Sequence, residues 1–254
     1  MTGRERVYST RAIVLKRRDQ GEADRVLTVY TPNLGKRVLL ARGVRRPASR
    51  KAGHLEPFAH VSLLVAKGRT WDLVTQAETI YGFRVLREDL DRIAHAYYML
   101  ELIEAFTEEE DSHPELYDLL LAGLNNLEHT EQPGLTARWF ELALLRLTGY
   151  QPQLFHCVRC SLPLEPVTNY FDPERGGTLC PRHGEGQPGA EPLDVGTLKV
   201  LRYVQTQPYE ETMRLNLTEA RMREVERVLA RTIRTVVERR LRSPEFIRVL
   251  QQSS

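Results

Sequence analysis

The chain has 254 residues, 41% of them hydrophobic, which is enough to bury a core in one large domain or two small ones. This composition argues against global disorder, and no apolar run approaches the ~20 residues of a membrane span. The charged N-terminus shows no signal peptide, and three cysteines are too few for a disulfide framework. We therefore expect a cytoplasmic protein with no membrane association.

The net charge of +2 hides a strong segregation of charge along the chain. Residues 1–80 carry sixteen Lys or Arg and seven Asp or Glu, a net charge of +9. Residues 87–131 carry two Arg and thirteen Asp or Glu, a net charge of −11. The simplest alternative is that solvated faces differ in sign, but so large a swing predicts that the first segment attracts a polyanion and the second repels one.

The first eighty residues show the pattern of short β-strands with Gly-containing turns and no helical period. In the last of these segments, Trp71, Leu73 and Thr75 alternate and are expected to share one face. Closing the sheet into a barrel would remove its exposed edges, so a five-stranded OB-type barrel is predicted at residues 1–80. The five predicted strands lie at 7–16, 26–30, 38–41, around 61–65 and around 71–75.

A helical period begins near Arg87 and continues, with one interruption, to the C-terminal region. Ser112 is the expected N-cap of the second helix, and Gly149 is the expected end of the third. Asp194 and Thr218 are expected to cap two further helices, the last of which has a basic face. The apolar positions expected to form one buried face of the first helix are Leu90, Ile93, Tyr97, Leu100, Ile103 and Phe106.

All three cysteines lie in the Pro- and Gly-rich interruption of this helical pattern. Cys157–Cys160 is a CxxC pair and Cys180–His183 is a CxxH pair, with nineteen residues between them. Three thiolates and one imidazole suffice for a closed tetrahedral zinc site, which leaves no position for water or substrate. We therefore expect one structural Zn²⁺ bound by Cys157, Cys160, Cys180 and His183, and a hairpin between the two pairs.

A redox-active CxxC pair is the main alternative, but such a pair opens a helix within a βαβ unit, which this segment does not resemble. His156 is a rival fourth ligand, although its adjacency to Cys157 gives it poor geometry. The predicted architecture is thus α+β and multidomain: the barrel at 1–80, then a helical domain at 81–254 that contains a zinc-binding insertion at about 150–190.

Basic residues cluster at the strand ends of the predicted barrel and in the loop at 42–53. Lys and Arg side chains neutralise phosphates without reading bases, so the cluster predicts affinity for nucleic acid without sequence specificity. Tyr8, Tyr30, Phe58 and Trp71 are candidate stacking platforms, although an aromatic side chain in a small barrel is more often part of the core. The predicted DNA-binding residues are Lys16, Arg17, Arg18, Arg25, Lys36, Arg37, Arg42, Arg45, Arg46, Arg50 and Lys51.

The predicted barrel contains a set of motifs at specific spacings: Ala12–Leu15, Gly21–Arg25, Gly35-Lys36, Ala41–Pro47 and Leu55–Phe58. In these motifs the barrel segment resembles the RecO family of bacterial recombination mediators. The resemblance continues more weakly through Gly149–Pro152 and the cysteine pairs to Ser243-Pro244. Relatives often carry Cys at the position of His183, and histidine preserves metal coordination.

The resemblance implies an N-terminal OB fold, a helical C-terminal domain with an inserted zinc finger, and a role in DNA repair. It also implies binding of single- and double-stranded DNA, annealing of complementary strands and, with RecR, the loading of RecA on DNA coated by single-strand-binding protein. The expected location is the bacterial cytoplasm, in association with the nucleoid.

Two other classes of function stay open. An enzyme is disfavoured because the sequence has no GxxxxGK[ST] or HExxH motif, and because Asp19, Glu22 and Asp24 are expected to form ion pairs with neighbouring arginines. A zinc-containing OB-fold protein that binds RNA or assists transcription is the second alternative. Preference for RNA or for one duplex sequence would favour it.

Overall fold

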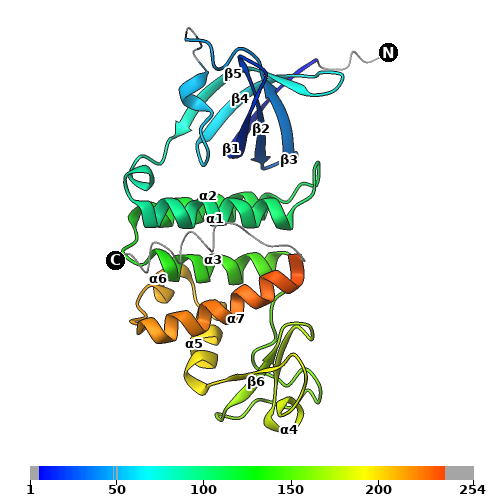
Figure 1. Cartoon of the computed structure of the whole chain (residues 1–254), viewed down its shortest axis with the longest axis vertical. Helices are drawn as coiled ribbons and strands as arrows, with labels where there is room; N and C mark the ends of the chain where they lie inside the picture. Colours follow the sequence, from blue (N-terminus) through cyan, green and yellow to red (C-terminus); the bar gives the residue numbers. More distant parts are fainter. Residues whose placement is uncertain (1–5, 48, 50, 238–254) are drawn as a thin grey trace. The chain divides into compact units, whose positions relative to one another are not determined.

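The structure is a computed structural model that describes residues 6–47, 49 and 51–237 (Figure 1). Its described residues form two compact units, which divide between His129 and Thr130. The first unit contains all five predicted strands and the first two helices of the predicted helical domain. The acidic segment of the sequence therefore belongs, by its contacts, with the basic barrel.

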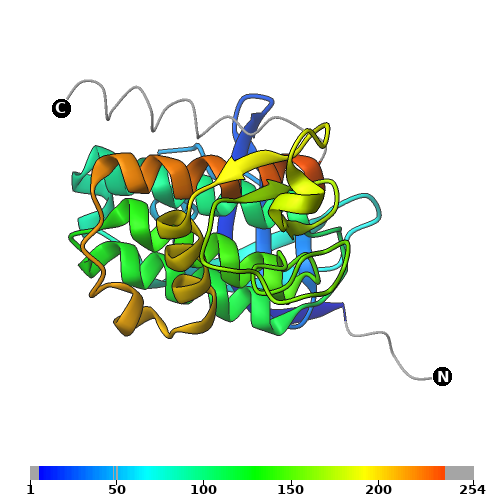
Figure 2. The same cartoon turned by 90° about the horizontal axis from the view of Figure 1, so that it is seen from below.

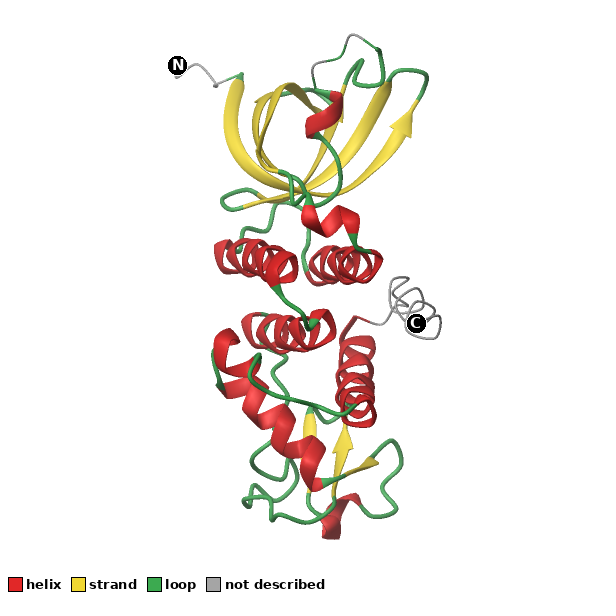
Figure 3. Cartoon of the chain, turned by 90° about the vertical axis from the view of Figure 1, so that its left-hand side faces the viewer, coloured by secondary structure: helices red, strands yellow, loops and turns green. Residues whose placement is uncertain are grey.

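The five strands of the first unit close into a barrel with the order β1-β2-β3-β5-β4, in which β3 and β5 run parallel (Figure 3). This order, returning from β4 to β1, confirms the predicted five-stranded OB-type barrel. The strands are β1 (Val7–Gln20), β2 (Asp24–Thr31), β3 (Gly35–Ala41), β4 (His60–Ala66) and β5 (Asp72–Tyr81).

Strand β1 is long because it serves two neighbours. Its first half pairs with β4 as far as Ile13, its second half pairs with β2, and the register shifts between Val14 and Lys16. Ala12 and Val14 lie in the barrel core, whereas Ile13 and Leu15 are buried outside that core, on the side that contacts α1. A strand buried on both faces explains why Ala12–Leu15 reads as an uninterrupted apolar run.

The alternation of Trp71, Leu73 and Thr75 does not mark the buried face of β5. Val74 and Ala77 are buried in the barrel core, whereas Thr75 is exposed and Leu73 is only half-buried. The pairing of β4 with β5 shifts register between Leu64 and Val65. A one-residue irregularity of this kind transfers the buried side chains to the opposite alternation.

Helix α1 (Leu90–Phe106) follows the short 3₁₀ helix η2 (Val85–Glu88), and its expected buried face was only partly correct. Leu100 and Ile103 are buried, but Leu90 is 63% exposed and Tyr97 is 40% exposed. The helix contacts β1, η2 and α2, so side chains on several of its sides are buried. A single apolar face could not predict which side chains of α1 are buried, because its neighbours lie on more than one side of the helix.

Helix α2 (Pro114–His129) buries five leucines that share the helical period of the sequence: Leu116, Leu119, Leu120, Leu124 and Leu127. The helix begins at Pro114, so its N-cap position is His113. The predicted N-cap, Ser112, was therefore one residue too early. The hydroxyl of Ser112 instead donates to the carbonyl of Pro32 in the turn between β2 and β3, at 3.1 Å.

The second unit combines helices with a small three-stranded sheet of order β7-β6-β8. Helix α7 packs against α3 and α5 (Figures 1 and 2). Among the described residues, no helix is long and apolar enough to cross a membrane. The elements are α3 (Pro133–Leu147), β6 (Asn169–Asp172), β7 (Gly177–Leu179), α4 (Pro181–Gly184), β8 (Glu191–Leu193), α5 (Val195–Thr206), α6 (Tyr209–Thr212) and α7 (Glu219–Val237).

Both predicted caps of the second unit are confirmed. The carboxylate of Asp194 accepts from the backbone N–H groups of Gly196 and Thr197 at the start of α5, and Thr218 accepts from that of Arg221. Helix α3 ends before Gly149, as predicted, with a φ of 81° at that glycine. The predicted apolar residue Leu241 and the basic residues Arg239 and Arg240 lie outside the described residues.

Candidate nucleic-acid interface and metal centre

The structure gathers the four predicted metal ligands, Cys157, Cys160, Cys180 and His183, into one cluster. Their ligand atoms all lie within 4.8 Å of one another. The His183 Nδ1 atom is 3.7 Å from the Cys157 Sγ atom and 3.3 Å from the Cys180 Sγ atom. Tetrahedral zinc with Zn–S and Zn–N bonds of normal length separates sulfur from nitrogen by about 3.6 Å. The donor set and its spacing fit one metal ion.

The two ligand pairs are held together by the small sheet. Strands β6 and β7 form the predicted hairpin, and α4 begins directly after Cys180. The Val158 N–H donates to the carbonyl of Thr178 in β7, at 3.0 Å, which ties the first pair to the second. His156 forms an isolated bridge with Pro163 and is not part of the cluster, which contains His183 instead.

The environment of Cys157 favours its thiolate form. Burial raises the pKa of this thiol, but backbone N–H groups of Cys180, Arg159 and Cys160 and the side chain of His183 outweigh burial, and the pKa falls to about 6. Because the thiolate is the metal-binding form, these backbone donors favour metal binding at Cys157.

Four of the predicted DNA-binding residues line two adjoining clefts on the outer face of β1, β2 and β3. The first cleft has a volume of about 280 Å³ and the second about 500 Å³. They share Arg18, Val38 and Glu109, and together we call them the barrel groove. The strand 2–3 face of an OB barrel, with the loop between strands 4 and 5, is where such barrels bind oligonucleotides. The four cations of the groove are Lys16, Arg18, Lys36 and Arg37.

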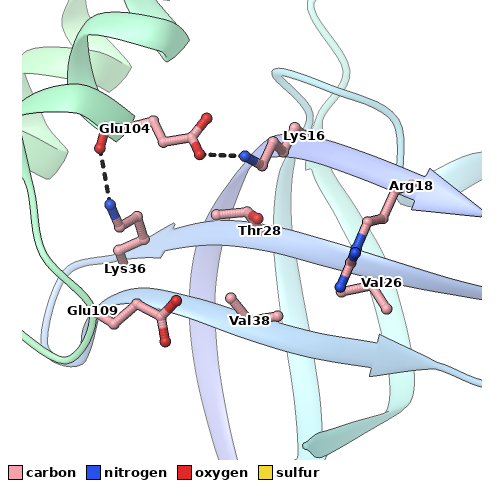
Figure 4. A pocket seen from close by; sticks show the side chains of 8 residues that line it. All are labelled: Lys16, Arg18, Val26, Thr28, Lys36, Val38, Glu104 and Glu109. Atoms are coloured by element: carbon pink, nitrogen blue, oxygen red, sulfur yellow. Dashed lines mark hydrogen bonds and ion pairs between the residues drawn. The ribbon is translucent and has the colours of Figure 1, made fainter. Parts of the chain in front are cut away.

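Three of these cations already contact acceptors from the acidic segment. Lys16 forms an ion pair with Glu104, and Arg37 Nη1 lies 2.6 Å from an oxygen of Glu110. Lys36 donates to the backbone carbonyls of Glu104, at 2.9 Å, and Thr107. Figure 4 shows Lys16 and Lys36 reaching toward Glu104 from β1 and β3, while Arg18 lies beside Val26.

A second group of predicted cations forms an ion-pair network beside the β1–β2 turn. Arg17 pairs with Glu56, and Arg25 lies 3.0 Å from Asp19 and 3.6 Å from Glu56. Arg45 lies 3.4 Å from Asp19. These cations are therefore partly neutralised within the protein. As predicted, Asp19 is used in ion pairs rather than in a cluster of metal-binding carboxylates.

The remaining predicted cations lie in and around the loop after β3. Arg42 and Arg46 are exposed, whereas Lys51 donates to the carbonyls of Arg42 and Val74 at 3.3 and 3.0 Å. Burial lowers the pKa of Lys51. Lys51 thus fastens the loop to β5, while Arg42 and Arg46 face solvent. Arg50 lies outside the described residues.

The four candidate stacking residues have different surroundings. Tyr30 and Phe58 are fully buried and cannot stack on a base. Tyr8 packs against the barrel core and its hydroxyl donates to Asp72, at 2.8 Å. Trp71 is half-buried and lines the second cleft beside Arg37, so it is the candidate platform of the barrel groove.

Sequence reasoning did not identify the partners of the groove cations. Glu104, Glu109 and Glu110 belong to the segment that was expected to repel nucleic acid, and the structure places them at the groove. The opposite net charges of residues 1–80 and 87–131 were the available signal, since two segments of opposite sign attract each other within one unit.

The described residues thus combine a closed OB-type barrel that bears a cationic groove with a Cys₃His cluster that could hold one metal ion. The family described as recombination protein O, N terminal, matches residues 5–83, and that described as recombination protein O, C terminal, matches residues 87–245. The chain belongs to the RecO family.

Curated relatives agree over nearly the whole chain. "DNA repair protein RecO" of Roseiflexus sp. is 41% identical over 98% of this chain and 88% of the relative. Proteins of the same name from Dehalococcoides mccartyi and Desulforudis audaxviator are 38% and 37% identical, over 91% and 97% of this chain and 91% and 98% of the relatives.

Proposed function

We propose that this protein is a recombination mediator in DNA repair that binds single- and double-stranded DNA, anneals complementary strands, and with RecR helps to load RecA on DNA coated by single-strand-binding protein. The barrel groove is the observation that carries the proposal. It joins four cations and Trp71 on the face where OB barrels bind oligonucleotides. This combination suits phosphates and stacked bases without a base code.

Annealing requires no chemistry on DNA in this proposal. Two single strands repel each other because both backbones are anionic, and a protein that binds both raises their effective concentration. Arg42 and Arg46 extend the exposed cationic surface beyond the groove. The protein would therefore act by charge screening and positioning, and no enzymatic step is proposed.

The Cys₃His cluster supports a structural role for one Zn²⁺. Three thiolates and one imidazole complete a tetrahedral shell, so a bound zinc ion has no open position for catalysis. The surrounding segment, residues 150–190, has three very short elements, β6, β7 and α4. We propose that the metal reinforces the small core of this segment, in which Leu154, Phe171 and Leu179 are buried.

The domain organisation is also proposed. Residues 1–80 form the nucleic-acid-binding barrel, and residues 81–254 form a helical domain that contains the zinc-binding insertion. RecR, single-strand-binding protein and a place in the bacterial cytoplasm at the nucleoid are proposed from membership of the RecO family. The family match supports DNA as the nucleic acid over the RNA-binding alternative.

A strand-annealing assay tests the function. Two complementary oligonucleotides, each coated with single-strand-binding protein, are mixed with and without the purified chain. We expect the chain to accelerate duplex formation without nucleotide hydrolysis. Absence of acceleration by folded protein would contradict the proposal, and measured ATP hydrolysis or strand cleavage by pure protein would overturn the non-enzymatic mechanism.

A further inference from the structure

The barrel groove is bordered by a run of four acidic residues, Glu108 to Asp111, in the connection between α1 and α2. Glu109 lines both clefts, and Glu110 lines the second and pairs with Arg37. At the end of α1, Glu104 pairs with Lys16. Carboxylates thus stand at a groove whose cations suit phosphates.

The α1–α2 connection not only lies near the barrel but is also hydrogen-bonded to strand β3. The Glu110 N–H donates to the carbonyl of Lys36 at 3.1 Å, and Glu109 forms a parallel bridge with Lys36. This bridge lies before Leu39, where the pairing of β3 with β5 begins, so the connection occupies the part of the β3 edge that β5 leaves uncovered. A Cβ atom at Gly35 would collide with the backbone of Asp111, which shows how closely the two chains approach.

The conformation of Glu110 fits this attachment. Its φ is 65°, a left-handed conformation that residues other than glycine rarely adopt. The backbone bond to Lys36 and the ion pair with Arg37 hold it there. A left-handed conformation persists only where surrounding contacts maintain it. In Glu110 this conformation directs the carboxylate toward the groove cation Arg37.

We propose that the α1–α2 connection is an intramolecular competitor for the barrel groove: Glu109 and Glu110 occupy the places of DNA phosphates, and single-stranded DNA must displace these carboxylates to bind. The inference rests on the proposed DNA-binding function. The Glu110 carboxylate is 71% exposed, and exposed ion pairs are weak and readily exchanged. Competition therefore lowers affinity without abolishing it, and favours long, multiply charged ligands over single anions.

Salt dependence follows from the same exchange. Arg37 pairs with Asp72 as well as with Glu110. When DNA displaces the Glu110 carboxylate, that carboxylate takes up a cation from solution, so the net release of counterions on binding is smaller. Removing the carboxylates should therefore tighten DNA binding at low salt and make the logarithm of affinity fall more steeply with the logarithm of salt.

The test compares two double variants in the full-length protein. Glu109→Gln/Glu110→Gln removes the competing charges, and Glu108→Gln/Glu115→Gln removes two exposed carboxylates from the same region. Both pairs change the net charge equally and preserve side-chain size, so a difference between them reports the groove. The Kd for a fluorescent oligo-dT is measured by anisotropy at several salt concentrations.

We expect the groove variant to bind about threefold to tenfold more tightly than the control variant at low salt, the size of effect that weak ion pairs produce. DNA binding by the groove variant alone would support the same conclusion. If the two variants bind within twofold of each other and of the unchanged chain, the competitor is overturned while DNA binding stands. If none of the three proteins binds, both the competitor and the proposed function fail.

Discussion

At the scale of single residues, Asp194 shows how one side chain serves two purposes. It caps α5 and also lies 2.5 Å from the guanidinium of Arg221 in α7, so it joins the two helices. Burial raises its pKa, but the bonds from Arg221, Thr197 and Gly196 outweigh burial, and the pKa falls to about 2. The charged form is therefore favoured by folding.

The pH dependence of stability follows with a definite sign. Because the folded-state pKa of Asp194 lies below its ordinary value of 3.8, its contribution is present above about pH 4 and is lost as the pH falls toward 2. Asp194→Ala should destabilise the second unit by about 1 kcal/mol at neutral pH, the usual cost of losing an N-cap. Asp194→Asn keeps a capping oxygen and should cost less while removing this part of the acid dependence.

Thermal unfolding of the three proteins between pH 2 and pH 7 measures both effects. An unchanged acid dependence in Asp194→Asn would contradict the assignment. A Thr218→Ala variant, which removes a cap that carries no charge, serves as the control for capping alone.

Trp71 carries the second prediction at this scale. Because a base stacked on an aromatic side chain contributes ~1–3 kcal/mol, Trp71→Ala should weaken binding of single-stranded DNA by about tenfold. Duplex DNA, whose bases are already stacked, should be affected less. Anisotropy titrations with both ligands measure the difference, and Tyr8→Phe, which removes only the bond to Asp72, is the control. Equal losses for the two ligands would show that Trp71 is not a stacking platform.

At the scale of elements, the segment around the Cys₃His cluster consists of short strands and a short helix, which the proposed metal would hold together. Strand β7 has three residues and α4 has four, too few to bury a core of their own. The barrel, in contrast, has a continuous apolar core. Loss of the metal should therefore act locally.

We expect purified protein to contain about one zinc ion per chain, and chelation to increase hydrogen exchange in residues 150–193 while the barrel strands keep their protection. Metal analysis by mass spectrometry and exchange measured by peptide provide the two readouts. Cys157→Ser/Cys180→Ser should lose the metal, whereas His156→Ala should retain it. Freshly prepared protein without zinc, or retention by the double cysteine variant, would refute the assignment.

At the scale of the whole molecule, the proposed mechanism depends on charge screening and positioning of the strands, with no chemistry on DNA. If annealing follows from screening and positioning, annealing rate should fall in proportion to DNA occupancy across variants such as Arg18→Glu, Arg42→Glu and Arg46→Glu. Asp24→Asn should leave annealing unchanged if the chain stays folded, since no carboxylate chemistry is involved; its carboxylate accepts from the Gly43 N–H.

The measurement plots annealing rate against bound fraction for each folded, monodisperse variant. A variant that binds DNA fully yet anneals nothing would show that screening and positioning are insufficient.

Local patterns in the sequence were sufficient for several features of this protein. The spacing of Cys157, Cys160, Cys180 and His183 predicted the cluster, because two ligands with two residues between them can reach one ion from a short turn, and two such pairs complete a tetrahedral shell. Alternating apolar segments with Gly-containing turns determined the barrel, and Asp194 and Thr218 marked helix starts because capping acts over three residues.

Only the tertiary structure decided which basic residues are available and what faces them. Lys16, Arg25 and Arg37 look alike in the sequence, yet each contacts a carboxylate, and those of Lys16 and Arg37 come from helices and turns more than seventy residues away in the chain. The buried sides of α1 and β5 were also decided by neighbours and by a register shift. Long-range contacts of this kind depend on how the elements pack against one another. The spacing of residues along the chain carries no information about that packing, so these contacts could not be predicted from it.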